Sequence, residues 1–520
     1  MATGAELSYN TGASALQMAN AIFGDGVTVR AASYTGASTS KAIYSNGELA
    51  PGVVPSNTGV ILSTGRAADF TQSGGDPNRF TGQTADTTGP NNVAQLNALA
   101  GTNTYDAAIL DVDFVPAGTV MTMRFVFSSE EYPEYANSPF NDLFGVWVNG
   151  ANVPIVVGNG QVGVTNINQD TQTNLTVGNT TDAFNTEMDG FTVTLTLKMV
   201  VNPGVVNSIR IAIADTSDAQ YDSNVLIAGD SAQTVLVAGN DAATLTATGS
   251  GTIDVLANDR GAAGSTLTIT QVNGVDVTAG QVVTLASGQQ VRLNADGTVT
   301  VIGDGREGTA YFTYTVVDGL GRTDTGIVTV DAVPCFVAGT RILTPGGEVP
   351  VESLRSGDLV CTLDDGPRPL RWVGRRTVAA TGDLAPVHIR AGTLGEHRAL
   401  SVSPQHRILL RDLRAELLFG EAEVLVAAKD LVDGRAVVRR EGGEVEYVHL
   451  LFDRHQVVLS EGLPTESFLP GPVGLNAFER AVQDEILALF PELDPATGAG
   501  YGPAARRSLR AFETAVLRTA

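Results

Sequence analysis

The chain has 520 residues, a formal net charge of −24, 43% hydrophobic residues and 58 glycines. This length allows two to four domains with their own cores, and a glycine-rich, threonine- and valine-rich composition favours β-domains with tight turns over helical bundles. Acidic residues outnumber basic ones by 31 to 11 over residues 1–334 and by 25 to 21 over residues 335–520. An acidic surface of this kind repels phosphate backbones, which argues against nucleic acid as a partner.

The N-terminus carries no recognisable export signal. The first 29 residues contain no lysine or arginine and no continuous apolar core, and no run of transmembrane length follows. Two cysteines do not make a disulfide framework. We therefore expect a chain that either stays in the cytoplasm or leaves by a route that does not read the N-terminus, such as type I-like secretion.

Residues 1–232 are predicted to form one large β-domain, with a short amphipathic helix over Ala13–Phe23 followed by strands that alternate apolar and polar residues. Two blocks stand out, Ser-Ser-Glu-Glu-Tyr-Pro-Glu-Tyr with the following Phe-Asn-Asp-Leu-Phe-Gly-Val-Trp-Val-Asn-Gly, and residues 211–227. Together they resemble the choice-of-anchor L domain of bacterial surface and exported proteins, over roughly 8–230. The resemblance implies an extracellular β-sandwich-like module and leaves its ligand undefined, with a surface glycan or a protein as the candidates.

Acidic residues within the same two blocks are candidate ligands for Ca²⁺, which prefers carboxylate and carbonyl oxygens. The alternative is that they are solvated loop acids and hydrogen-bond acceptors at strand ends. No loop has the regular ligand spacing of an EF-hand, so both interpretations stay open, and no cofactor is required. The candidates are Glu130, Glu131, Asp142, Asp215, Asp218 and Asp222, with Glu134 and Asn141 beside them.

Residues 233–333 are predicted to form a second, smaller β-unit. An Asp-Gly hairpin turn at 296–297 lies between two alternating strands, and the strands 312–317 and 327–330 close the unit. The pattern resembles the bacterial cadherin-like, Ig-like repeats, here in a single copy. The resemblance implies a spacer, with Ca²⁺ binding by its interface aspartates as the alternative.

From residue 335 the composition changes, and both cysteines and all five histidines lie at or beyond that position. The motif Cys-Phe-Val-Ala-Gly-Thr-Arg-Ile is followed in order by Gly-Asp-Leu-Val, Leu-Arg-Trp-Val-Gly, Ser-Pro-Gln-His-Arg and Tyr-Val-His-Leu-Leu-Phe-Asp-Arg-His. This ordered set resembles the Hint domain, the all-β fold shared by hedgehog autoprocessing domains and inteins, over about 335–472. The tail, 473–520, is predicted to form two packing helices, Ala477–Phe490 and Pro503–Leu517.

The resemblance implies autocatalytic cleavage at the Pro334-Cys335 bond. Cys335 Sγ would attack the preceding carbonyl, which requires a reactive thiol, a proton donor for the departing amide nitrogen and stabilisation of the oxyanion. We assign His406 to protonating the nitrogen of Cys335 and Ser403, where the families carry threonine, to holding the scissile amide.

Other residues of this region receive lesser roles. His455 is expected to assist breakdown of the thioester, with His449 and Asp453 as further candidates in the same segment. The remaining residues of reactive type are expected to be packed or surface side chains: His388 and His397, and Cys361 as a small buried strand residue.

The missing elements restrict the reaction. No terminal His-Asn pair follows the motif Glu-Ser-Phe, so splicing is not expected, and water or an external nucleophile would resolve the thioester. The crowded prolyl carbonyl of Pro334 favours slow or conditional cleavage. The chain itself is then the substrate of a single-turnover cysteine reaction.

Two hypotheses follow for the whole chain. The first is an exported surface protein whose Hint domain cleaves itself and releases or attaches a β-rich passenger. The second is an adhesive or binding protein in which the Hint fold is catalytically silent. A conventional hydrolase is disfavoured, because neither a Gly-x-Ser-x-Gly nor a His-Glu-x-x-His motif occurs.

Overall fold

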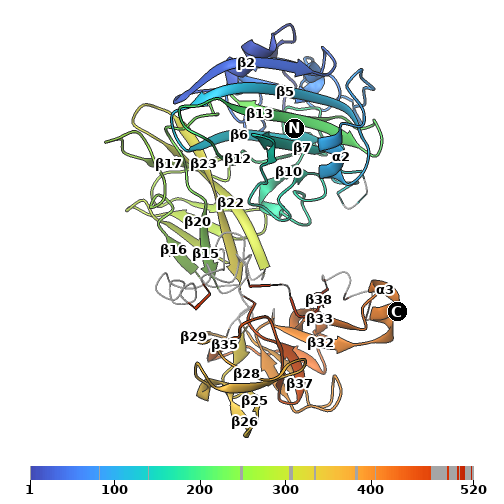
Figure 1. Cartoon of the computed structure of the whole chain (residues 1–520), viewed down its shortest axis with the longest axis vertical. Helices are drawn as coiled ribbons and strands as arrows, with labels where there is room; N and C mark the ends of the chain where they lie inside the picture. The colour runs from blue at the N-terminus through green and yellow to red at the C-terminus, as the bar shows by residue number, and fades with distance from the viewer. Residues whose placement is uncertain are drawn as a thin grey trace.

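The computed structural model shows a mainly β, multidomain chain, as predicted (Figure 1). Within the residues that the structure describes, six sheets follow one another in pairs along the sequence, so that each of three successive units has two sheets. The structure describes residues 2–80, 82–136, 138, 140–245, 250–303, 308–332, 335–380, 385–404, 406–469, 489–490, 501–502, 504–509, 514 and 517.

The N-terminal unit consists of two facing sheets. Its strands are β1 (Ser8–Asn10), β2 (Val27–Thr35), β3 (Lys41–Ser45), β4 (Gly59–Ser63), β5 (Thr104–Pro116), β6 (Val120–Ser129), β7 (Leu143–Val148), β8 (Ala151–Asn152), β9 (Val162–Gly163), β10 (Thr176–Gly178), β11 (Gly190–Thr192), β12 (Leu195–Val200), β13 (Asn207–Thr216) and β14 (Ser223–Ala228). One sheet has the order β1-β3-β4-β14-β6-β11-β10, with β12 also paired to β6, and the other has the order β2-β5-β13-β7-β8, with β9 on β7.

The core of this unit lies between its two sheets. Along β6, Met123, Phe125 and Phe127 point into the main core, while Val126 points to a second apolar cluster on the opposite face. This alternation follows from the period of two along a strand. Both faces of β6 are therefore buried, and the β-sandwich-like prediction is confirmed.

The predicted N-terminal helix is present as α1 (Ala15–Ile22). Ser14 caps it, since its side chain accepts the N–H of Gln17 and the Gln17 side chain accepts the N–H of Ser14. A second helix, α2 (Ala94–Ala100), packs through Leu96 on the outer face of the second sheet.

The middle unit is a smaller pair of sheets that includes the predicted Asp-Gly hairpin. Gly297 has φ +87°, a conformation that glycine adopts without strain, and it lies in the turn between two antiparallel strands. The strands are β15 (Asp241–Leu245), β16 (Ser250–Ile253), β17 (Thr268–Val272), β18 (Val275–Asp276), β19 (Val282–Thr284), β20 (Gln290–Leu293), β21 (Val299–Ile302), β22 (Gly308–Val317) and β23 (Thr323–Ala332). They form the sheets β15-β23-β22-β17-β18 and β16-β21-β20-β19.

A lysine of the first unit enters an acidic site of the second. Lys198, on β12, donates from Nζ to Asn240 Oδ1. Burial lowers the pKa of Lys198 to about 8, and nearby acids including Asp324 and Asp241 oppose that effect. Asp324 and Asp241 of the second unit thus lie close enough to the Lys198 ammonium group to stabilise its charge, and calcium binding by the interface aspartates of this unit stays a prediction.

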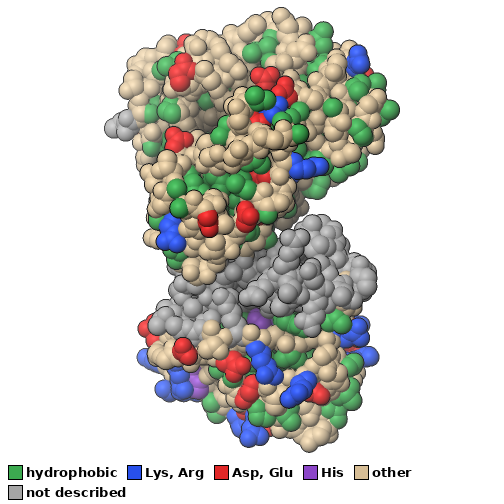
Figure 2. Space-filling model, turned by 90° about the vertical axis from the view of Figure 1, so that its left-hand side faces the viewer, with side chains coloured by type: hydrophobic (Ala, Val, Ile, Leu, Met, Phe, Trp, Pro, Cys, Tyr) green, Lys and Arg blue, Asp and Glu red, His purple; other side chains and the backbone are tan. Residues whose placement is uncertain are grey.

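The C-terminal unit carries more basic side chains than the rest of the surface, as Figure 2 shows in its lower part. Its elements are β24 (Phe336–Val337), β25 (Arg341–Thr344), β26 (Gly347–Pro350), β27 (Leu359–Thr362), β28 (Gly366–Pro369), β29 (Trp372–Ala379), β30 (Val387–Ile389), β31 (Leu400–Val402), β32 (Arg407–Arg411), α3 (Leu413–Phe419), β33 (Glu423–Ala427), β34 (Val437–Arg439), β35 (Glu444–Leu451), β36 (Val457–Ser460), β37 (Leu463–Glu466) and β38 (Arg507–Ser508). One sheet has the order β29-β35-β24-β31-β30-β34, and the other β26-β25-β36-β37-β32-β33-β38, with β27 paired to β28 and β36.

The tail differs from its prediction where the structure describes it. Most of the helix expected over Ala477–Phe490 lies outside the described residues. The helix expected over Pro503–Leu517 is wrong at Arg507–Ser508, which form β38 and pair in parallel with β33. Thr514 and Leu517 in the same range are helical, as is Leu489 of the first expected helix. The N–H of Leu509 donates to Leu425 O at 2.9 Å, so edge hydrogen bonds of an existing sheet decide the conformation over the helical spacing of apolar residues.

Candidate functional site

Cys335 directly precedes β24, which lies in the middle of a sheet. Its neighbour Phe336 pairs with β31 on one side and with β35 on the other. The N–H of Cys335 donates to Ser403 Oγ at 2.7 Å, and the N–H of Ser403 donates back to Cys335 O at 2.9 Å. Ser403 therefore hydrogen-bonds to the Cys335 backbone on both sides of its Cα. The Cys335 thiol beside it is buried and forms no disulfide.

His406 follows Ser403 through a tight turn, in which its N–H donates to Ser403 O at 3.0 Å. The imidazole is buried and packs on the Phe336 ring, with 4.3 Å between ring centroids. Burial lowers the pKa of His406 to about 4, so the ring is neutral at pH 7. Neither ring nitrogen has a hydrogen-bond partner among the described residues, which leaves both available to a reacting group.

The side chain that meets the thiol is His449. Its Nε2 lies 3.3 Å from Cys335 Sγ, and both residues are buried. His449 projects from β35, and the Trp372 and Phe468 rings pack around it with centroids at 6.5 Å and 5.6 Å. A Cβ on Gly374 would lie 2.0 Å from the Trp372 ring, so only glycine at this position, which pairs with His449, lets the indole lie there.

His455 lies in a different network. Its Nδ1 accepts the N–H of Ala505 at 2.9 Å, which places the ring proton on Nε2, 3.0 Å from Ser467 O. Glu466, 3.5 Å from His455 Nε2, also accepts from Arg407. Burial by itself would raise the pKa of Glu466, but Arg407 and His455 lower it to about 2. The ring nitrogens of His455 are thus engaged in holding two chain segments together.

Comparison with protein families agrees with this arrangement. Residues 334–472 match the family described as Hint domain. The C-terminal unit is a Hint domain. Residues 8–233 match the choice-of-anchor L domain and residues 230–331 match the bacterial Ig domain, so the chain carries these three domains in series.

Two solved structures are similar to parts of the chain. A bacterial intein-like domain from Clostridium thermocellum, known from a solution structure, has 17% identity and a TM-score of 0.19, covering 26% of this chain and 98% of its own. The M60 catalytic domain with two CBM51 domains of ZmpB from Clostridium perfringens has 10% identity and a TM-score of 0.14, covering 85% of this chain and 43% of its own. No curated protein matches the chain.

The other candidates of the Hint domain differ in their contacts and in their burial. Asp453 forms an ion pair with Arg371 at 3.2 Å, and its side chain is 64% exposed. His388 is packed, with Nδ1 3.0 Å from Ser401 Oγ. Cys361 lies on β27 as expected but is only half-buried.

The candidate calcium ligands of the choice-of-anchor L domain are mostly buried. Asp142 accepts from Thr216 N at 3.0 Å and from the Ser223 hydroxyl at 2.7 Å, and its own N–H donates to Glu131. Burial, reinforced by Asp142, raises the pKa of Glu131 to about 10. Glu130, Asp215 and Asp222 are also buried, whereas Asp218 and Glu134 are more exposed.

The described part of the chain shows no metal-binding arrangement at this acidic cluster. Within them, no group of three or more His, Cys, Asp or Glu side chains is arranged to hold a metal ion. Calcium binding therefore stays a prediction. Across the same part of the chain, no helix is long and apolar enough to cross a membrane.

Sequence reasoning gave His449 a lesser role than the structure favours, and it assigned no role to Trp372, Gly374 and Phe468. Their motifs, Leu-Arg-Trp-Val-Gly and Glu-Ser-Phe, were visible in the chain. Only the pairing of β29 with β35 brings the first motif beside His449. The scissile carbonyl belongs to Pro334, which lies outside the described residues.

Proposed function

We propose that the Hint domain cleaves its own chain at Pro334-Cys335. The observation that carries the proposal is the double engagement of Cys335, with its N–H on Ser403 Oγ and its Sγ beside His449 Nε2. A nucleophile thus lies next to a base, and the nitrogen that must depart lies next to a hydroxyl. Cys335 thus supplies both the attacking sulfur and the departing nitrogen of an N–S acyl shift.

In the first step His449 Nε2 takes the thiol proton and Cys335 Sγ attacks the carbonyl carbon of Pro334. The C–N bond then breaks, leaving a thioester on Sγ and a free amine on Cys335. The proton gained by the nitrogen balances the one lost by the thiol. The proton that His449 took from the thiol passes through His406 and the Ser403 hydroxyl, which is already bonded to the nitrogen, so both rings end the step neutral. A pKa of about 4 makes the protonated form of His406 a strong donor.

The thioester is then resolved by water, which leaves a carboxylate on Pro334 and restores the thiol, or by an external nucleophile that becomes attached to the passenger. Splicing has no support, since no terminal His-Asn pair follows the domain. In this scheme His455 is a positioning residue, because Ser467 and Ala505 occupy its ring nitrogens.

Intact-mass measurement of the full chain tests the proposal. Wild type incubated with a thiol or hydroxylamine should yield a 1–334 fragment, as free acid or as the trapped adduct. Cys335→Ala should yield none, and His449→Gln should slow release by about 10²-fold or more, the range for loss of a general base. Cys361→Ala and His397→Gln serve as matched controls that should cleave as wild type does.

Two outcomes would contradict cleavage at this bond. One is the absence of any 1–334 fragment from wild type across pH and thiol conditions. The other is a fragment that persists in Cys335→Ala. The silent-domain alternative makes the opposite prediction, that Cys335→Ala leaves size, export and surface attachment unchanged.

The choice-of-anchor L domain supports a surface location for the passenger. In our proposal the chain is exported, and cleavage releases the two N-terminal domains or transfers them to an acceptor. Fractionation of cells that express wild type and Cys335→Ala tests this part. A chain that stays in the cytoplasm in both cases would refute export while leaving the cleavage chemistry intact.

A further inference from the structure

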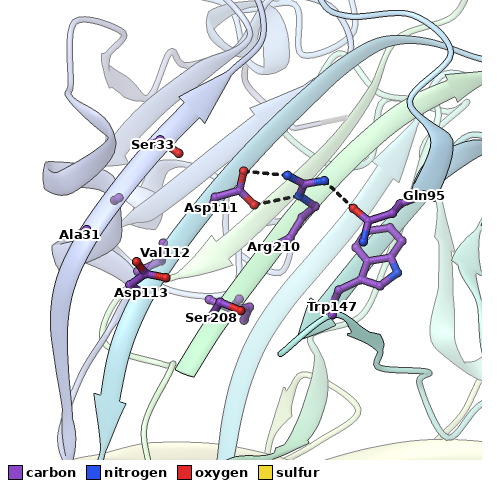
Figure 3. A pocket seen from close by; sticks show the side chains of 12 residues that line it. Ala31, Ser33, Gln95, Asp111, Val112, Asp113, Trp147, Ser208 and Arg210 are labelled. Atoms are coloured by element: carbon purple, nitrogen blue, oxygen red, sulfur yellow. Dashed lines mark hydrogen bonds and ion pairs between the residues drawn. The ribbon is translucent and has the colours of Figure 1, made fainter. Parts of the chain in front are cut away.

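A groove of about 430 Å³ lies on the outer face of the second sheet of the choice-of-anchor L domain (Figure 3). Along β5, Val112 faces the core while Asp111 and Asp113 face outward. Along β13, Ile209 faces the core while Arg210 faces outward. The volume falls within the roughly 300–1,000 Å³ that small-molecule sites occupy.

Strand register arranges the outward side chains in a row across four strands. Ser33 pairs with Asp111, Asp111 with Arg210, and Arg210 with Trp147. Adjacent members are thus about 4.8 Å apart along the row. Small side chains, Ser33 here and Ala31 and Ser208 in the next row, leave the floor of the groove open.

The centre of the row is a pair of fixed polar groups. Arg210 donates from Nε to Asp111 Oδ1 at 2.8 Å and from Nη2 to Oδ2 at 3.1 Å, and its Nη1 donates to Gln95 Oε1. Three of the five guanidinium N–H groups are engaged, so two remain, and each carboxylate oxygen keeps a lone pair. Both side chains are about one-third exposed, at 35% and 34%, so these groups are open to a ligand.

A ligand for this surface must both donate and accept hydrogen bonds at neighbouring positions. Adjacent hydroxyl groups of a sugar do so, and the bidentate pair is already ordered, so little side-chain entropy is lost on binding. Asp111, Asp113 and Arg210 together carry a net charge of −1, which disfavours phosphate, sulfate and uronate groups. Trp147 is only 6% exposed because it packs beside α2, so it forms a wall of the groove and leaves the polar groups to contact the ligand.

We propose that this groove binds a neutral oligosaccharide, through hydroxyl pairs that bridge Asp111 and Arg210. The proposal does not depend on the Hint reaction, because every residue that it uses belongs to the N-terminal domain. A protein with this site and a self-cleaving C-terminal domain would release or attach a sugar-binding passenger.

Isothermal titration of the full chain, kept intact by Cys335→Ala, tests the site. The probes are neutral hexasaccharides of glucose, mannose, xylose and N-acetylglucosamine at millimolar concentration, with an oligogalacturonate as the anionic comparison. At least one neutral probe should bind saturably, and the oligogalacturonate should not. Asp111→Ala should weaken binding at least 10-fold, because it removes the acceptors and releases Arg210.

A second variant keeps the test decisive if Asp111→Ala impairs folding. Ser208→Tyr changes an exposed side chain that lines the groove, and should block binding without altering the melting temperature. Arg414→Ala, which breaks a comparable exposed Arg–Asp pair of the Hint domain, should leave binding unchanged. Failure of all four neutral probes to bind, tighter binding of the oligogalacturonate, or full binding by Ser208→Tyr would each overturn the proposal.

Discussion

Acidification from pH 7 to about 4 is expected to destabilise the Hint domain through His406. Burial lowers the pKa of this imidazole from its ordinary 6.5 to about 4, so between these values the unfolded state binds more protons than the folded state. The stability linked to His406 is therefore complete above pH 6.5 and is lost as the pH falls toward 4. At ~1.4 kcal/mol for each pH unit, the loss is about 3 kcal/mol.

Glu466 continues the same trend at lower pH. Arg407 and His455 overcome the effect of burial and hold its pKa at about 2 instead of the ordinary 4.5. The stability that this carboxylate contributes is present above pH 4.5 and is lost as the pH falls through 2. The Hint domain should thus weaken in two successive stages.

Differential scanning calorimetry of the full Cys335→Ala chain separates these effects from cleavage. The Hint transition should move to lower temperature between pH 7 and 4, and His406→Gln should flatten that dependence. His397→Gln is the matched control, because the ring of His397 hydrogen-bonds to Leu394 and Arg398 of its own loop, and it should keep the slope. A transition that does not move in this range, or that moves as steeply in His406→Gln, would show that the buried ring does not control acid stability.

Four further outcomes are expected. The stability of the choice-of-anchor L domain should depend on pH in the opposite direction, since burial raises the pKa of Glu130 to about 9 and of Glu131 to about 10. The stability that these two carboxyl groups contribute is complete below the ordinary pKa of 4.5 and is lost as the pH rises through 9 to 10. Calorimetric scans extended to that pH measure the loss, and Glu131→Gln should make it smaller. If calcium binds the cluster, millimolar Ca²⁺ should raise this transition at alkaline pH, and an unchanged transition would contradict the calcium prediction. Gly374→Ala should lower the free energy of unfolding by about 1–3 kcal/mol and slow cleavage, because the added Cβ would lie 2.0 Å from the Trp372 ring. Calorimetry measures the stability and a gel assay measures the cleavage rate. Wild-type values of both would refute the packing argument. Ser403→Thr should cleave on a gel time course as wild type does, while Ser403→Ala should cleave at least about 10-fold more slowly. Equal cleavage rates for the two variants would show that the hydroxyl takes no part in the mechanism.

Much of the fold was predictable from local patterns. The alternation along β6, the Ser14 cap of α1 and the Asp-Gly turn before β21 each depend on neighbouring residues, so the chain shows them directly. The tail was less predictable, since the spacing of Leu509 fits a helix but the exposed edge of β33 pairs with β38.

The choice among the histidines needed the tertiary structure. His449 and His455 lie six positions apart in one segment, and either fits an assisting role in sequence. The strand β35 pairs with β24 and so carries His449 to Cys335, whereas His455 follows that strand and is held by Ser467 and Ala505. Sequence distance says nothing of such proximity, because it arises from strand pairing across more than a hundred residues.

The sequence by itself determined the three domain types, the position of Cys335 at a domain boundary and the Ser-x-x-His spacing, because each is a local order of residue types. The tertiary structure alone decided which histidine meets Cys335 and that Ser33, Asp111, Trp147 and Arg210 share one row. The physical reason is the same in both cases. Neighbours in a sheet are set by strand order and register, which bring together side chains that the chain keeps far apart.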